Sequence, residues 1–230
     1  MKKLIILCLM AAGLVISSQA KAITIEWKGL EWTMRGSASA TIREGDSLEI
    51  SVIPGSSNDP SPDNWVLTTP LPITTQWVEF SFIDTTGAGG LTVPRAYVDT
   101  SHDGGSTLIQ GGGYSGYSTA YINYHWYKNG WLINEWINLG TRTENSEHTF
   151  KVGRRPDGSI DLYYDGVLKA NVTDINPPFF GRAYLGIQAE GTGTAFGTYT
   201  NFSYGDTYIP EPATMTLLAI GALNLIRRRK

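Results

Sequence analysis

The sequence predicts an all-β protein in which short antiparallel strands form a two-layered sandwich. Apolar and polar residues alternate in many short segments, which is typical of strands with one buried face. Clusters rich in Gly, Pro, Asn and Asp separate these segments at intervals of about 8 to 15 residues. Between the two chain ends, no window shows a sustained helical period. A β-barrel is the less favoured alternative at this length.

The clearest strand signals lie between Glu147 and Ala170. Phe150 and Val152 alternate with polar residues, and a turn of Pro156-Asp157-Gly158-Ser159 follows them. A second alternating segment carries Ile160, Leu162 and Tyr164. Asp165-Gly166 then separates this segment from another apolar run, which is a strong hairpin signal. We therefore expect an antiparallel meander of three strands.

The other strands are expected from the same alternation. They cover residues 23–27, 37–42, 47–52, 77–83, 95–99, 121–127, 131–137, 183–189 and 198–204. Lys128-Asn129-Gly130 is the expected turn of one hairpin. Gly111 to Gly116 formally satisfies G-x-G-x-x-G, but no helix follows it to bind a phosphate. We therefore expect a flexible glycine-rich loop there.

The order of strands and turns after Glu147 resembles a known domain type. Strand, Pro-Asp-Gly turn, strand, Asp-Gly turn and strand are followed by Tyr184-Leu-Gly-Ile-Gln. This pattern is similar to the second half of concanavalin A-like lectin/glucanase domains, including the laminin-G type. The resemblance implies an antiparallel jelly-roll β-sandwich, which we place at residues 23–206.

The N-terminal residues 1–22 resemble a secretory signal. Lys2-Lys3 supplies the charged region, Leu4 to Ile16 the apolar region, and Ala20-Lys21-Ala22 the cleavage site. We therefore expect a signal helix that is removed, so that the mature chain starts at Ile23. An uncleaved membrane anchor is the alternative. Cys8 is the only cysteine and would leave with the signal.

The C-terminal residues 207–230 combine a turn motif, an apolar run and a basic cluster. Pro210-Glu211-Pro212 precedes the apolar stretch from Ala213 to Ile226, and Arg227 to Lys230 follow it. As a helix, this stretch would be about 21 Å long at ~1.5 Å per residue. The hydrocarbon core is ~30 Å thick, so the helix would be short for a permanent anchor.

These three parts, in this order, resemble the PEP-CTERM sorting signal. The residues that carry the resemblance are Pro210, Glu211, Pro212, Arg227, Arg228 and Arg229. The resemblance implies recognition by an exosortase-like membrane protease after transient insertion of the short helix into the inner membrane of a Gram-negative bacterium. An ordinary tail anchor is the alternative. We expect a final location in the cell envelope, at the surface or in the extracellular matrix.

The charge of the central region excludes some partners. Seven of the 18 basic residues and one of the 21 acidic residues lie outside residues 23–209. The remaining 11 basic and 20 acidic residues give a net charge near −9. Such a charge argues against nucleic acid and anionic membrane surfaces as partners.

The sequence contains no recognisable catalytic motif. Glucanases of the resembling type carry Glu-x-Asp-x-x-Glu on one strand, which places the carboxylates on one face. Here the nearest pair, Glu79 and Asp84, would lie on opposite faces. His102, His125 and His148 lack the spacing of zinc ligands. We therefore expect no catalytic residues and no metal site apart from one calcium candidate.

The calcium candidate comes from the resemblance to laminin-G-type domains. Asp99 and Asp103-Gly104-Gly105 would contribute to it, and solvated turn residues are the alternative interpretation. No other cofactor is expected.

Aromatic residues crowd into the hairpin after residue 120. Sugar rings stack on tryptophan and tyrosine, so one face of this hairpin is a candidate glycan platform on the concave sheet. The alternative is that these rings fill the core. The candidate glycan-binding residues are Trp65, Tyr124, His125, Trp126, Trp131 and Trp136.

Two classes of function follow from these observations. The favoured expectation is an exported, exosortase-sorted surface or matrix protein with a non-catalytic, lectin-like domain that associates with polysaccharide. The alternative is a secreted glycan-active enzyme, a hydrolase or a lyase, that lacks a recognisable catalytic motif.

Overall fold

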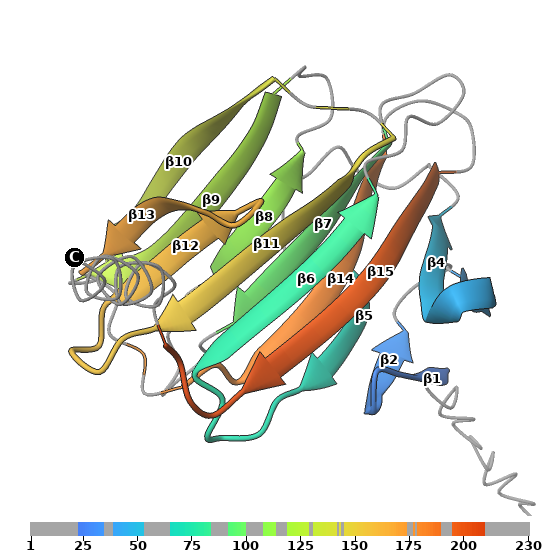
Figure 1. The fold of residues 1–230 in the computed structure, drawn as a ribbon, viewed down its shortest axis with the longest axis horizontal. Coiled ribbons are helices and arrows are strands. Elements are labelled where there is room, and N and C mark those ends of the chain that lie inside the picture. The colour runs from blue at the N-terminus through green and yellow to red at the C-terminus, as the bar shows by residue number, and fades with distance from the viewer. Residues whose placement is uncertain are drawn as a thin grey trace, which may run out of the picture.

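The structure is a computed structural model, and it contains two antiparallel β-sheets packed face to face (Figure 1). It describes residues 23–34, 39–52, 65–83, 92–99, 108–113, 119–128, 131–141, 143, 145–173, 177, 179–189 and 195–209. The expected signal, residues 1–22, lies outside this part of the chain, as does the expected sorting segment, residues 207–230, apart from its first three residues. No helix in the described part is long and apolar enough to cross a membrane.

The first layer, here called sheet A, has eight strands. Their order across the sheet is β1 (Thr24–Trp27), β2 (Leu30–Met34), β5 (Trp65–Pro70), β14 (Arg182–Ala189), β7 (Thr92–Asp99), β8 (Leu108–Gly113), β9 (Thr119–Lys128) and β10 (Trp131–Thr141). Every neighbouring pair is antiparallel. The hairpin predicted around Lys128-Asn129-Gly130 is confirmed as β9 and β10.

The second layer, sheet B, has seven strands, and a short 3₁₀ helix (Glu44–Asp46) joins two of them. Their order is β13 (Val167–Val172), β12 (Ile160–Tyr164), β11 (Glu147–Arg154), β6 (Trp77–Ile83), β15 (Ala195–Gly205), β4 (Ser47–Val52) and β3 (Ser39–Arg43). The predicted meander is confirmed as β11, β12 and β13. Asp165 and Gly166 take φ values of 51° and 70° in its second turn, as hairpin turns of this kind require.

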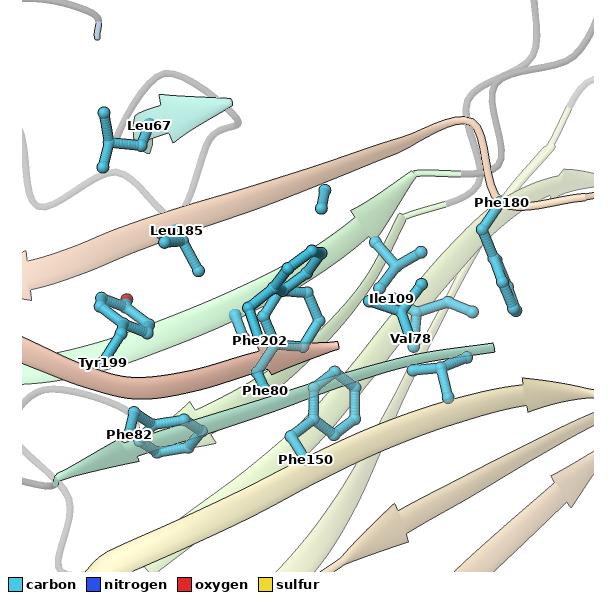
Figure 2. Packing of buried hydrophobic residues seen from close by; sticks show 14 of the residues in the cluster. Leu67, Val78, Phe80, Phe82, Ile109, Phe150, Phe180, Leu185, Tyr199 and Phe202 are labelled. Carbon is cyan, nitrogen blue, oxygen red and sulfur yellow. The ribbon is translucent and has the colours of Figure 1, made fainter. Parts of the chain in front are cut away.

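The core lies between the two sheets and is rich in aromatic rings. Phe80 and Phe150 stack with ring centroids 6.2 Å apart, and the Phe202 ring lies 5.0 Å from that of Trp32. Figure 2 shows these phenylalanine rings beside Ile109, which comes from sheet A. The described part of the chain contains no disulfide partner, since Cys8 lies outside it, so burial of apolar surface is the main stabilising contribution.

Gly111 corrects one expectation. The first three glycines of the glycine-rich segment do not form a loop. They belong to β8 (Leu108–Gly113), which lies between β7 and β9 in sheet A. A Cβ atom on Gly111 would lie 2.4 Å from the ring of Phe150. The glycine therefore lets a ring from sheet B pack directly against the backbone of sheet A.

Candidate functional site

The candidate site lies on the outer face of sheet A, the face directed away from sheet B. Alternation along each strand places one set of side chains in the core, among them Ala96, Val98, Ile109, Ile122 and Leu185. The residues between them therefore belong to the outer face. On an ordinary solvated sheet these residues would be polar and exposed.

One line of outer-face residues crosses seven neighbouring strands, and we call it the central row. Each member is the direct register partner of the next, because the strand pairs are in alignment at this level. The central row consists of Thr33, Thr68, Tyr184, Tyr97, Gln110, Asn123 and Trp136, from β2 to β10. Directly opposed side chains on neighbouring strands are within contact range, so the row forms a continuous surface.

The middle of the central row is buried, although it lies on the face directed away from sheet B. Tyr97 is 4% exposed, Gln110 8% and Asn123 3%. Tyr97 and Tyr184 form an apolar cluster that is separate from the core between the sheets. These outward side chains are therefore packed against their neighbours rather than solvated.

A carboxylate and a phenol meet beside the row. Tyr184 Oη donates a hydrogen bond to Asp99 Oδ2 over 3.2 Å, and Asp99 is 8% exposed. Burial raises the pKa of the Tyr184 phenol, and the negative charge of Asp99 raises it further, while Arg182 opposes the shift. Tyr184 therefore remains a protonated donor at neutral pH.

Three side-chain amides continue the site toward β10. Gln110 Nε2 donates to Asn123 Oδ1 over 2.6 Å, and Asn123 Nδ2 donates to Asn134 Oδ1 over 2.6 Å. Asn123 Nδ2 also donates to the backbone oxygen of Glu135 over 2.9 Å. These bonds hold the amides of β8, β9 and β10 in one arrangement.

Unpaired polar atoms concentrate on the same face. Four buried side-chain atoms in the described part of the chain lack a hydrogen-bond partner: Thr68 Oγ1, Thr75 Oγ1, Gln110 Oε1 and Thr119 Oγ1. Thr68, Gln110 and Thr119 all belong to the outer face of sheet A. Buried polar atoms without partners are rare in folded proteins, and a ligand is one of the ways in which they become satisfied.

An exposed aromatic pair ends the row at the β10 edge. Trp136 is 42% exposed, and its ring meets that of Tyr121 edge to face with centroids 5.9 Å apart. Of the two glycan-binding candidates whose side chains the structure describes, Trp136 and Tyr124, Trp136 is the one on the outer face with an exposed ring. Tyr124 lies on the other face of β9 and packs against the core, as the alternative interpretation expected.

The remaining candidates from the sequence are placed by their strands. His125 and Trp126 lie in β9, opposite Asn134 and Ile133 of β10. Trp131 begins β10, and Trp65 begins β5 opposite Gly186. Pro210, Glu211, Pro212 and Arg227 to Arg229 lie outside the described residues.

Tyr97, Gln110 and Tyr184 are site residues that the sequence alone does not predict. Alternation indicates that Tyr97 and Tyr184 are on the opposite face from their apolar neighbours, but it does not show that they are adjacent. Gln110 precedes the glycines that were expected to form a loop. Only the register of β14, β7 and β8 brings the three residues together.

The structure describes only part of the calcium candidate. Asp99 lies at the end of β7 and accepts the hydrogen bond of Tyr184, whereas Asp103-Gly104-Gly105 lies outside the described residues. Within the described ranges, no group of three or more His, Cys, Asp or Glu side chains is arranged to hold a metal ion.

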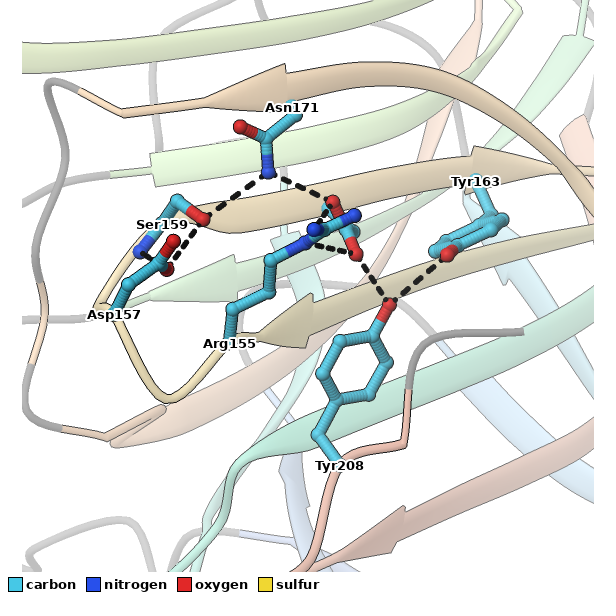
Figure 3. A network of polar contacts seen from close by, with 7 residues as sticks. Arg155, Asp157, Ser159, Tyr163, Asn171 and Tyr208 are labelled. Carbon is cyan, nitrogen blue, oxygen red and sulfur yellow. Dashed lines mark hydrogen bonds and ion pairs between the residues drawn. The ribbon is translucent and has the colours of Figure 1, made fainter. Parts of the chain in front are cut away.

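Sheet B carries a second polar network on its own outer face (Figure 3). The fully buried carboxylate of Asp161 accepts two bonds from Arg155 Nε, at 2.9 and 2.8 Å, and one from Tyr208 Oη at 2.9 Å. The ring of Tyr208 lies over Gly153, where a Cβ atom would approach it to 2.1 Å. This network ties the segment after β15 to sheet B, so its role is structural.

The chain is similar to known proteins in its fold. No family model and no curated protein matches the chain. Solved structures do match its fold. The fold is that of the concanavalin A-like glucanases.

Three solved structures illustrate the similarity. A glycosidic hydrolase in its native form has a TM-score of 0.56 at 17% identity, covering 83% of this chain and 92% of its own. The Bacillus licheniformis β-glucanase has a TM-score of 0.56 at 16% identity, and the match covers 80% of this chain and 95% of the glucanase. A prokaryotic β-1,3-1,4-glucanase (lichenase) derived from a mouse hindgut metagenome has a TM-score of 0.53 at 13% identity. That match covers 73% of this chain and 83% of the lichenase.

These similarities correct the favoured expectation about function. The chain was expected to be a non-catalytic, lectin-like protein and not an enzyme, but the three structures that share its fold are glycoside hydrolases. They support the alternative of a glycan-active enzyme. The expectation was wrong because it relied on the lack of a linear carboxylate motif, and such a motif cannot reveal groups that the sheet register brings together from separate strands.

Proposed function

We propose that the protein is a glycan-active enzyme, a hydrolase or a lyase, that cleaves a polysaccharide bound across the outer face of sheet A. The observation that carries this proposal is the buried Asp99–Tyr184 pair beside the central row. The shared fold with glycoside hydrolases supports it.

The proposed binding surface is long enough for a polymer. Strands in a sheet are about 4.8 Å apart, so the six strands from Thr68 to Trp136 span roughly 24 Å. That length suits several consecutive sugar residues. The exposed ring of Trp136 would bind the face of one sugar at the β10 end, while the amides of β8 to β10 hydrogen-bond hydroxyl groups.

The proposed chemistry centres on Asp99. Cleavage of a glycan needs a group that gives or takes a proton at the bond being broken. Asp99 is a carboxylate at the end of β7, held beside the central row by the Tyr184 phenol, which remains protonated because its pKa is raised. Most glycosidases use two carboxylates, and we assign one of these roles to Asp99.

The test is cleavage by the purified protein. Mixed-linkage β-glucan, alginate and carrageenan are incubated with wild type and with Asp99→Asn, and reducing ends are counted. Ultraviolet absorbance of an unsaturated product distinguishes a lyase from a hydrolase. Wild-type cleavage that Asp99→Asn abolishes supports the proposal, and a wild type inactive on every glycan in a broad panel would contradict it.

We also propose that the enzyme is exported and sorted. The support is the charged, apolar and small-residue order of residues 1–22 and the PEP-CTERM-like order of residues 207–230. On this proposal, an exosortase-like membrane protease is a partner, and the enzyme works in the cell envelope or outside the cell, where polysaccharide is present.

A further inference from the structure

The orientation of one amide on the central row is determined by the backbone. Asn123 Nδ2 lies 2.9 Å from the backbone oxygen of Glu135, and a carbonyl oxygen can only accept. The atom of Asn123 that faces Glu135 must therefore be the nitrogen. Its other side-chain end, Oδ1, must be the acceptor that faces β8.

The orientation of Gln110 follows from that of Asn123. Because Asn123 presents an acceptor, the Gln110 atom 2.6 Å away must be the donor Nε2. Gln110 therefore keeps Oε1 as its remaining end. This oxygen is buried and has no hydrogen-bond partner in the described part of the chain. Rotation of the amide would place oxygen against oxygen, so the arrangement is locked.

We propose that Gln110 determines specificity by presenting Oε1 as an acceptor for a sugar hydroxyl, so that the enzyme selects neutral glycans. The inference rests on the proposed function of this face. A carboxylate or sulfate at the same position would bring a second acceptor against Oε1, with no proton between them. Oε1 is enclosed in the unbound protein, so the proposal requires that a side chain beside it moves before a sugar hydroxyl can reach it.

The net charge of the protein also favours a neutral glycan over an anionic one. Residues 23–209 carry 11 basic and 20 acidic residues, and this net negative charge repels an anionic polymer. Arg182 lies on the same face, but its direct register partner is Asp99, whose charge offsets it. Thr68 Oγ1, on the far side of Tyr184 and Tyr97, is a hydroxyl oxygen that can donate or accept. It therefore does not discriminate between neutral and anionic sugars.

The test compares binding of three glycans to the full-length protein by isothermal titration calorimetry. A mixed-linkage β-glucan oligosaccharide, an alginate oligosaccharide and a carrageenan oligosaccharide of similar length are titrated at one ionic strength. We expect the neutral oligosaccharide to bind most tightly. Gln110→Met should weaken its binding by roughly 3- to 12-fold, as expected for one lost hydrogen bond. Asn201→Ala, on the outer face of sheet B, is the matched control and should change nothing.

A substrate-side measurement keeps the test valid if Gln110→Met folds poorly. Partial O-methylation of the neutral oligosaccharide removes hydroxyl donors but keeps acceptor oxygens. It should weaken binding to wild type, and in a folded Gln110→Met protein the loss should be smaller. Tighter binding of an anionic glycan to wild type, or no loss on methylation, would overturn the inference.

The outcomes also separate this inference from the proposed function. Selective binding of the neutral oligosaccharide without cleavage would support the role of Gln110 and remove the enzymatic proposal. Cleavage with a preference for alginate or carrageenan would support an enzyme and contradict the role of Gln110.

Discussion

Tyr184 on β14 donates a hydrogen bond to Asp99 on β7, with 3.2 Å between Oη and Oδ2, although the residues are 85 positions apart. The bond joins two strands of sheet A on its outer face. Burial of the phenol and the nearby carboxylate both raise the pKa of Tyr184, so the donor keeps its proton. The pair is where proton transfer would occur in the proposed enzyme, and it gives the first prediction.

Asp99→Asn should abolish glycan cleavage while leaving the fold intact. A neutral amide keeps the volume of the side chain but cannot act as an acid or a base, and such groups contribute about 10²- to 10⁴-fold to rate. Rates of reducing-end release give the measurement, and circular dichroism confirms folding. Tyr184→Phe, which leaves the carboxylate in place, should have a smaller effect. Equal rates in wild type and Asp99→Asn would exclude Asp99 as a proton-transfer group.

Trp136→Ala should weaken glycan binding without unfolding the protein. The ring is exposed at the end of the central row, so its loss removes about 1 to 2 kcal/mol of apolar contact with a sugar, at ~25 cal/mol per Å² buried. Phe196→Ala on β15 is the matched control, since Phe196 is 45% exposed but belongs to sheet B. Titration with β-glucan oligosaccharides measures both, and equal losses in the two variants would count against a platform at Trp136.

Gly111→Ala should destabilise the sandwich. The added Cβ would lie 2.4 Å from the Phe150 ring, and overpacking of this kind costs about 1 to 3 kcal/mol. Urea unfolding measures the change in the free energy of unfolding. The double variant Gly111→Ala with Phe150→Leu removes the ring that causes the clash, so the two changes should be non-additive. Strictly additive changes in the free energy of unfolding would show that the Phe150 ring is not the reason for a glycine at position 111.

The free energy of unfolding should fall as pH rises above about 10. Burial raises the pKa of Tyr208, and hydrogen bonds with Tyr163 and Asp161 raise it further. Above the ordinary tyrosine pKa of about 10, the unfolded chain loses this proton while the folded chain keeps it. Stability then decreases by up to about 1.4 kcal/mol per pH unit for this group. Tyr184 shifts in the same direction and adds to the slope.

Tyr208→Phe isolates the contribution of Tyr208 to that slope. The variant should be less stable at neutral pH by about 1 to 3 kcal/mol, because the buried Asp161 carboxylate loses one donor. Above pH 10 its stability should fall less steeply than that of wild type. Urea unfolding at several pH values measures both effects, and parallel curves for the two proteins would contradict the assignment.

Replacement of Pro210-Glu211-Pro212 by alanines should hold the protein in the inner membrane. The prolines prevent helix continuation upstream of the apolar run, so the motif would be extended and accessible to a membrane protease. Fractionation of tagged wild type and variant in a host with the sorting system measures the distribution. Identical distribution and tail retention would show that the tail is an ordinary anchor.

Much of the fold could be predicted because its signals are local. The alternation in β11 and β12 and the Asp165-Gly166 turn lie within a few residues of each other, and short-range sterics determine both. The two-layered sandwich follows, because strands with one apolar face must bury that face against another sheet. The glycine-rich β8 was mistaken for a loop, because its need for glycine comes from Phe150, 39 positions later in the chain.

The sequence by itself therefore determined the class of fold, the strands of the meander and the net charge of residues 23–209. The tertiary structure decided the candidate site. In the sequence, Asp99 is only a calcium candidate, Tyr184 is an outward residue of another strand, and Gln110 precedes a run of glycines that predicts a loop. They become one surface because the register of β14, β7 and β8 aligns them, and register depends on contacts between segments far apart in the chain.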